Sequence, residues 1–216
     1  MKILFFTLLP ALIVILFFYF ANKFKNHKVF ILKAFILGIL ICFPAGYFNT
    51  YIVQIFSNNN EVNNALLMGF FAGGLTEEIL KFLALLFYLP TQKKLKKFDV
   101  VIFALFISLG FAVYENFGYV FNSSENSFEI AFLRAFTAVP MHIFNGVLMG
   151  YFFEFYILSR DKKFLGYSIL LPIIMHGSYN FFAFANLNIS KAIILIMIFL
   201  SFKLKQIHDQ NFKNFR

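Results

Sequence analysis

The chain has 216 residues, of which 61% are hydrophobic and only 13% are charged. A soluble domain of this size carries about 25% charged residues, so the composition excludes an ordinary soluble protein. The formal charge of +9 lies largely in short connectors between apolar segments. Because no basic face with interleaved aromatic residues is present, we expect no nucleic-acid partner, and the lipid bilayer is the expected surrounding.

Apolar segments of roughly 18 residues or more recur along the chain, and each is long enough to span a bilayer as a helix. We predict an all-α fold, a polytopic membrane helical bundle of about seven transmembrane helices in a single integral membrane domain, residues 1–216. The first segment has no small-residue cleavage pattern after it, so we interpret it as an uncleaved anchor. The predicted helices cover residues 3–21, 29–56, 64–89, 98–121, 129–158, 164–185 and 189–204.

The connectors between these helices alternate in charge. Residues 22–28, 90–97 and 159–163 carry three, four and three basic residues. Residues 57–64 and 122–129 carry acidic residues and no base. Because basic connectors face the cytoplasm, the pattern predicts a multi-pass protein of the inner (plasma) membrane, with the N-terminus outside and the C-terminus cytoplasmic.

Four of the predicted helices carry polar residues deep in the membrane, where an unpaired charge is costly and usually functional. Measured from the predicted outer ends at about 1.5 Å per residue, the clusters lie about 10 to 20 Å deep, so they can meet in one layer. The residues, taken helix by helix, are Glu77, Glu78 and Lys81; Glu115 and Asn116; Arg134, His142 and Asn145; and His176 and Asn180.

The spacing within the third helix predicts how its charges divide. Glu77 and Glu78 lie four and three residues before Lys81, so the lysine can reach either carboxylate. The two glutamates differ by about 100° around a helix. We therefore expect one of them to face a cavity and the other to be held by Lys81 or by a neighbouring helix.

The fifth predicted helix carries three further features. Pro140 is expected to loosen the helix just before His142. Gly146 and Gly150 form a pair of small residues suited to close contact with another helix. Arg134 lies near the predicted outer boundary, and we interpret it as reaching toward the lipid headgroups.

This set of residues can hydrolyse an acyl bond without a protein nucleophile. A partly dehydrated glutamate acts as a general base toward water, a histidine can protonate the leaving amine, and an asparagine can donate to the oxyanion. No GxSxG motif is present, and Cys42 lies on a different helix from every cluster. His142 and His176 with Glu77 or Glu115 could instead hold zinc. Because no HExxH motif is present, we favour a metal-free glutamate mechanism with no cofactor.

Four short motifs lie on successive predicted helices. In order, they are EEILK (77–81), GFAVYEN (110–116), His142 followed by Gly150, and His176 followed by Asn180. Together they resemble the motifs of the PrsW family of membrane proteases, which is similar in its motifs to the CAAX-protease and bacteriocin-processing superfamily. The resemblance implies an endopeptidase of regulated proteolysis that cuts a single-span membrane protein, such as an anti-sigma factor, near the extracytoplasmic side.

The resemblance also implies roles for individual residues. Glu77 matches the family's first glutamate, which activates water in the superfamily, and Asn180 matches the asparagine that stabilises the oxyanion. We therefore predict five catalytic residues and three supporting ones. They are Glu77, Glu78, His142, His176 and Asn180, supported by Lys81, Glu115 and Asn116.

Two other functions remain open. Buried glutamate, histidine and lysine also build proton relays, so a membrane transporter is one alternative, although the chain shows no internal repeat. A non-catalytic membrane scaffold or immunity-type protein on the same fold is the other.

Overall fold

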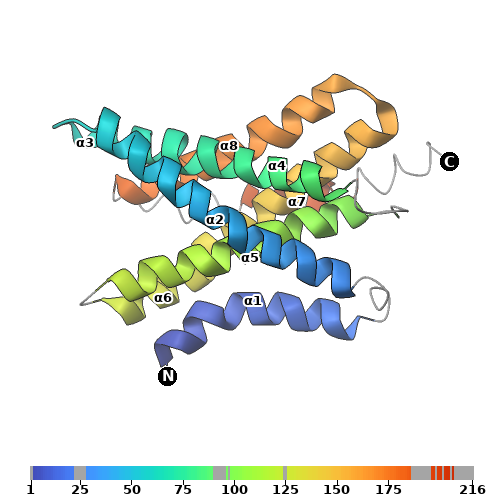
Figure 1. Cartoon of the computed structure of the whole chain (residues 1–216), viewed down its shortest axis with the longest axis horizontal. Coiled ribbons are helices and arrows are strands. Elements are labelled where there is room, and N and C mark those ends of the chain that lie inside the picture. The colour runs from blue at the N-terminus through green and yellow to red at the C-terminus, as the bar shows by residue number, and fades with distance from the viewer. Residues whose placement is uncertain are drawn as a thin grey trace.

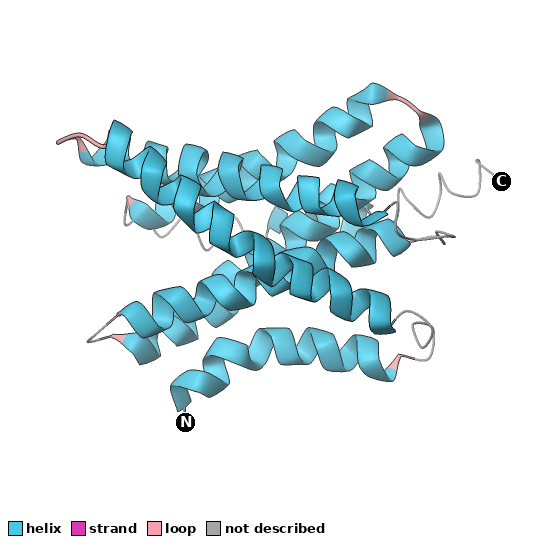
Figure 2. Ribbon diagram, viewed as in Figure 1, coloured by secondary structure: helices cyan, strands magenta, loops and turns pink. Residues whose placement is uncertain are grey.

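The computed structural model describes residues 2–21, 28–89, 96, 98–123, 126–185, 196–197, 199–200, 202–204 and 206. Every regular element in these residues is helical (Figure 2), which confirms the all-α prediction. Most of the last predicted segment, 189–204, lies outside the described residues. In chain order the helices are α1 (Lys2–Phe20), α2 (Lys28–Phe56), α3 (Glu61–Leu66), η2 (Leu67–Glu77), α4 (Glu78–Tyr88), α5 (Asp99–Asn122), α6 (Ser127–Phe136), α7 (Ala138–Ser159) and α8 (Lys162–Phe184).

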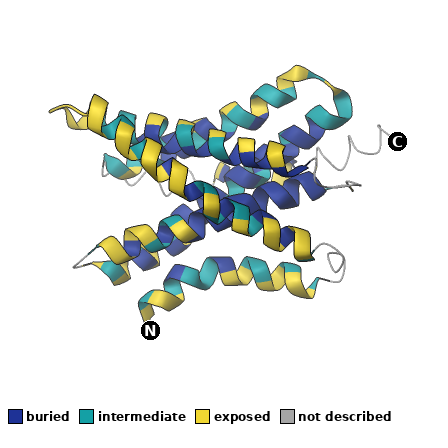
Figure 3. Ribbon diagram, viewed as in Figure 1, coloured by how far each residue is buried: buried dark blue, intermediate teal, exposed yellow. Residues whose placement is uncertain are grey.

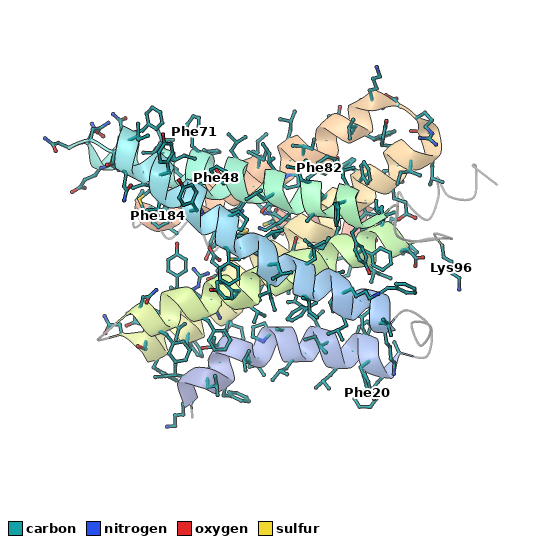
Figure 4. The ribbon with its side chains drawn as sticks, viewed as in Figure 1. Phe20, Phe48, Phe71, Phe82, Lys96 and Phe184 are labelled. Carbon is teal, nitrogen blue, oxygen red and sulfur yellow. The ribbon has the colours of Figure 1, made fainter. Side chains whose placement is uncertain are left out.

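Helices α1, α2, α5 and α8 begin and end within two residues of the predicted bounds. By length and composition, α1, α2, α5 and the α6–α7 segment are apolar enough to cross a membrane. Large apolar side chains cover the outside of the bundle: Phe48 and Phe71 are 46% and 55% exposed, whereas Phe82 is buried (Figure 4). An apolar surface this extensive belongs in lipid, so the protein is a membrane helical bundle.

The third predicted helix is continuous but changes its winding. Residues 67–77 form a π-helix, and the Thr76 hydroxyl donates to the carbonyl of Phe71, five residues earlier, at 2.9 Å. The π-helix ends at Glu77, and α4 begins at Glu78. The two adjacent carboxylates therefore lie where the winding changes, a feature that is frequent at functional sites.

The fifth predicted helix, 129–158, is wrong as a single element. Helix α6 ends at Phe136 and α7 starts after Thr137, whose φ and ψ of −125° and −72° are not helical. Pro140 explains the break, because proline has no N–H for the carbonyl of Phe136 and its ring clashes with that carbonyl. The Thr137 hydroxyl instead donates to the Leu133 carbonyl at 2.7 Å. The break lets α6 take its own direction across α5.

Helix α5 forms the centre of the bundle, between α2 and α7, and it is buried over most of its length (Figure 3). Helix α8 packs against η2 and α7, while α1 lies at the edge against α6 and α5. A Cβ atom added at Gly146 would lie 2.7 Å from the carbonyl oxygen of Ala104, and one at Gly150 would meet the backbone of Val101. The predicted close contact at these glycines is therefore confirmed, with α5 as the partner.

The two ends of the bundle carry different connectors (Figure 1). The end of α2, the short α3 and the α5–α6 connection lie at one end, and the α7–α8 turn lies at the other. At that turn Asp161 caps α8 by accepting from the amide of Lys163 at 3.0 Å. Hydrogen bonds from Lys163 hold the pKa of the Asp161 carboxyl below its ordinary value. The placement of these connectors at opposite ends of the bundle agrees with the predicted alternation of acidic and basic connectors. The orientation of the bundle in the membrane stays a prediction.

Candidate active site

The buried cluster is centred on the ammonium group of Lys81, whose side chain is fully buried. Its Nζ lies 2.8 Å from Glu78 Oε1, 3.8 Å from Glu77 Oε2 and 2.9 Å from His142 Nδ1. The prediction that Lys81 reaches both carboxylates is thus confirmed. A buried charge is tolerated only when it is paired and hydrogen-bonded, and Lys81 meets that condition with partners from its own helix and from α7.

Each of the two histidines has a carboxylate of its own. His176, on α8, places Nδ1 2.7 Å from Glu78 Oε1, and His142, on α7, places Nε2 2.9 Å from Glu115 Oε2. The two rings meet edge to face with centroids 4.9 Å apart. Because the Lys81 ammonium can only donate, His142 Nδ1 accepts and its proton sits on Nε2, facing Glu115. Because the Glu78 carboxylate can only accept, His176 Nδ1 carries the proton and donates to it, which leaves the lone pair of His176 Nε2 free.

Glu77 is the carboxylate that faces a cavity, while Glu78 is held by Lys81 and a histidine, as the spacing predicted. Glu77 Oε1 accepts from the amide of Asn49, on α2, at 3.0 Å. Glu77 Oε2 and His176 Nε2 lie 3.8 Å apart, and neither has a hydrogen-bond partner among the described residues. Two unpaired buried polar atoms aimed at each other are costly to keep, which marks a place for a ligand or a reacting group.

One donor atom from each of Glu77, His142 and His176 lies within 4.8 Å of the others. Two nitrogens and one carboxylate oxygen form a donor set that zinc uses with three protein ligands. The carboxylates of Glu78 and Glu115 behind the two histidines match the outer partners that orient metal-binding imidazoles. The residues therefore fit a divalent cation, although His142 Nδ1 is occupied here by Lys81.

Arg134 does not reach toward the headgroups, and that interpretation is wrong. Its Nη2 lies 2.7 Å from Glu115 Oε2, its Nε donates to Asn116 Oδ1 at 2.9 Å, and its guanidinium stacks 4.0 Å from the ring of Tyr119. The side chains of Arg134 and Glu115 are only 15% and 16% exposed. The break at Thr137 orients α6 so that Arg134 faces α5. The sequence signal was the presence of Glu115 at a similar predicted depth.

Asn116 is brought into the network but not into the cavity. Its side chain is fully buried, and its amide donates to the carbonyl of Thr7, on α1, at 3.0 Å. Together with the bond from Arg134, this contact connects α1, α5 and α6. Asn116 therefore supports the position of Arg134 and, through it, of Glu115.

Asn180 lies one helical turn after His176 and forms no hydrogen bond to the cluster among the described residues. It packs against Gly73 of η2, where an added Cβ atom would clash with the Asn180 amide. It also lines a cavity of about 290 Å³ together with Glu77 and Asn49. Asn180 was predicted to lie beside the reacting groups, and it shares a cavity with Glu77 in which a ligand could reach both side chains.

A second cavity, of about 640 Å³, lies on the other side of Glu77, between α2, α5 and α6. Glu77 and Glu115 both line it, so the charged cluster has direct access to it. Asn49, which lines both cavities, was missed from the sequence. The available signal was a polar Asn-Thr pair within a largely apolar predicted helix.

The chain matches the family described as PrsW family intramembrane metalloprotease over residues 26–204. A protease PrsW of Bacillus subtilis (strain 168) is 30% identical over 88% of this chain and 87% of its own length. A protease PrsW of Oceanobacillus iheyensis is 29% identical over 95% of both chains, and one of Clostridioides difficile (strain 630) is 28% identical over 80% of this chain and 72% of its own. No solved structure matches this chain.

Proposed function

This chain belongs to the PrsW family of intramembrane metalloproteases. From that membership we propose that it hydrolyses a peptide bond of a membrane-protein substrate, with Glu77 as the catalytic carboxylate. The observation that carries the proposal is that Glu77, which lines two cavities, and His176 each keep one buried atom, Oε2 and Nε2, without a hydrogen-bond partner among the described residues. A proton relay would bond these atoms to each other or to neighbours. A hydrolase needs them free for water and for the leaving amine.

In the proposed reaction Glu77 acts first. The Asn49 amide holds Oε1, so Oε2 is the oxygen that takes a proton from the attacking water. The resulting hydroxide adds to the scissile carbonyl, and Asn180, at the wall of the smaller cavity, donates to the oxyanion. The carbon–nitrogen bond then breaks as His176 Nε2, carrying the proton from Glu77, passes it to the leaving amine.

The remaining residues position these groups and balance their charge. Glu78 and Glu115 each fix the tautomer and the ring orientation of one histidine. Lys81 and Arg134 each pair with one of these carboxylates, so that neither is left as an uncompensated buried charge. We propose these as supporting roles.

Glu77, His142 and His176 would also hold a zinc ion. Such an ion would supply Lewis-acid polarisation of the carbonyl and of water. The unpaired Glu77 Oε2 and His176 Nε2 and the description of the family as metalloproteases support this second form. The contact between Lys81 and His142 Nδ1 supports the metal-free form, because Lys81 must leave that nitrogen before His142 binds a metal through it.

Metal analysis separates the two forms. Purified wild type and His176→Gln are compared for bound zinc, alongside their thermal unfolding with and without a chelator. About one zinc per wild-type chain would support the zinc form. If His176→Gln loses this zinc together with the chelator-sensitive part of the stability, His176 is a ligand. A zinc-free protein that still cuts its substrate assigns Glu77 as the general base.

We propose that the substrate is a single-span membrane protein, such as an anti-sigma factor, and that the protease lies in the inner (plasma) membrane. The larger cavity supports a cut near the extracytoplasmic side. It is lined by Asn122 and Ser123, the first two residues of the acidic connector 122–129 that is predicted to lie outside.

The test compares new protein N-termini in host membranes that contain wild type, Glu77→Gln or Glu61→Gln at matched levels. Glu61 is an exposed residue of α3, so its substitution controls for the loss of a carboxylate. We expect a short set of extracytoplasmic or juxtamembrane cuts with wild type and Glu61→Gln and none of them with Glu77→Gln. The same cuts with Glu77→Gln would overturn the mechanism, and no cuts with folded wild type would favour the transporter or scaffold alternative.

A further inference from the structure

Helices α2 and α5 touch at a single crossing and separate beyond it. At the crossing, a Cβ atom on Gly38 would clash with the carbonyl oxygen of Ile107, and one on Gly110 would clash with that of Phe35. The two backbones are therefore in direct contact here, and helices that cross at an angle diverge on both sides of the contact. Figure 1 shows α2 passing over α5, with the later ends of the two helices apart.

The cavity of about 640 Å³ fills the angle between the two diverging helices. One turn beyond the crossing, Phe43 of α2 and Tyr114 of α5 meet with ring centroids 4.7 Å apart, and Tyr114 is one of the lining residues. Farther out the walls include Gly46 and Gly118, where an added Cβ atom would meet nothing within 4 Å. Glu77 stands among the lining residues, so this groove leads to the proposed reacting group.

The smaller cavity, of about 290 Å³, continues the groove past Glu77. The two cavities share Asn49, Thr50, Glu77 and Tyr119 as lining residues. A polypeptide that occupied both would pass the Glu77 carboxylate with residues on either side of it. An internal cut in a chain requires this arrangement, whereas removal of a terminal residue needs a groove on one side only.

The lining of the groove favours a polypeptide over a lipid. Asn49 Oδ1 is buried and has no hydrogen-bond partner among the described residues, so it is available to a backbone N–H. An unwound segment in a bilayer needs such partners, because no water replaces its lost helical hydrogen bonds.

We propose that the groove between α2 and α5 admits, sideways from the bilayer, a locally unwound segment of a single-span membrane substrate, and that Gly46 and Gly118 keep it wide enough. The inference rests on the proposed function and adds the path and the conformation of the substrate. Side chains at the two glycines would project into the open space between the helices. Cleavage should therefore depend on side-chain volume at these two positions.

The test is a size series at Gly118, with alanine, leucine and phenylalanine, together with Gly46→Phe. Gly166→Phe is the matched control, because Gly166 is also a helical glycine with nothing within 4 Å of an added Cβ, and it lies on α8 outside both cavity linings. The readout is the rate of the cuts that wild type makes and Glu77→Gln does not, measured with the thermal unfolding midpoint of each variant.

We expect the rate to fall with side-chain size, by about 100-fold for Gly118→Phe, while the midpoint stays near that of wild type and Gly166→Phe cuts normally. Wild-type rates in both Gly46→Phe and Gly118→Phe would overturn the inference and leave the protease function intact. An equal loss in Gly166→Phe would also overturn it. Failure of the proposed function is read separately, from wild type against Glu77→Gln.

Discussion

Replacing Arg134 with methionine tests whether the outer part of the polar network supports catalysis. The substitution keeps most of the side-chain volume and removes the ion pair with Glu115, the bond to Asn116 and the stacking on Tyr119. A charged hydrogen bond contributes about 1.5–3 kcal/mol, a neutral acceptor about 0.5–1.5 and a cation–π contact about 0.5–1. The sum spans about 2.5 to 5.5 kcal/mol, which agrees with about 3–5 for breaking a buried pair.

We take the lower part of that range, because His142 Nε2 remains as a hydrogen-bond partner for Glu115 when Arg134 is lost. A loss of about 3 kcal/mol lowers the unfolding midpoint of a chain of this size by about 6 to 12 °C. With His142 as its remaining partner, Glu115 holds the orientation of the imidazole less firmly. We therefore expect cleavage to fall by about 10- to 100-fold, as for other residues that orient a functional histidine.

The assay is thermal unfolding in detergent together with the rate of substrate cleavage, for Arg134→Met, Arg134→Lys and the double variant Arg134→Met with Glu115→Gln. The double variant leaves no uncompensated charge, so it should regain stability without regaining activity. Arg134→Lys should be intermediate, because lysine cannot bond Glu115 and Asn116 together through a planar fork. Arg134→Met with wild-type stability and activity would refute the assignment of Arg134 to the site.

Two further substitutions test the inner part of the site. Asn49→Leu removes the bond to Glu77 Oε1 and the oxygen that we propose for the substrate backbone, so we expect about tenfold slower cleavage and a loss of about 1–3 kcal/mol of stability; normal cleavage would show that Asn49 serves neither role. Lys81→Met leaves Glu78 and His142 without their shared donor in a fully buried place, and we expect a loss of about 3–5 kcal/mol of stability. Thermal unfolding of the Lys81→Met protein measures this loss of stability. A variant as stable as wild type would contradict the pairing of Lys81 with Glu78 and His142.

The separation of the two adjacent glutamates shows how far helical spacing could predict the site. A difference of about 100° around a helix was enough to expect one carboxylate in a cavity and one in a buried ion pair. Glu77 and Glu78 take these two places. The prediction did not depend on the π-helical winding of residues 67–77. That winding changes the angle between successive residues, but adjacent side chains still point in different directions.

Arg134 and Asn49 show where prediction from the sequence stopped. The place of Arg134 depends on the break at Thr137, because only a separate α6 brings it against α5. Asn49 matters because α2 diverges from α5 after Gly38 and brings its later turns beside η2. Neither contact joins residues that are near each other in the chain, so a local pattern could single out the polar residue but not its partner.

The sequence by itself determined that the chain is an all-α membrane bundle, the bounds of α1, α2, α5 and α8 to within two residues, and the set of polar groups that the helices carry. These follow from transfer between water and lipid, which depends on local composition and makes every intramembrane charge conspicuous. Only the tertiary structure decided that His176 pairs with Glu78 and His142 with Glu115, and that Glu77 Oε2 and His176 Nε2 stay unpaired. Those pairings depend on how closely the helices approach and at what angle they cross. Glycine contacts between distant parts of the chain and the proline-induced break between α6 and α7 determine both.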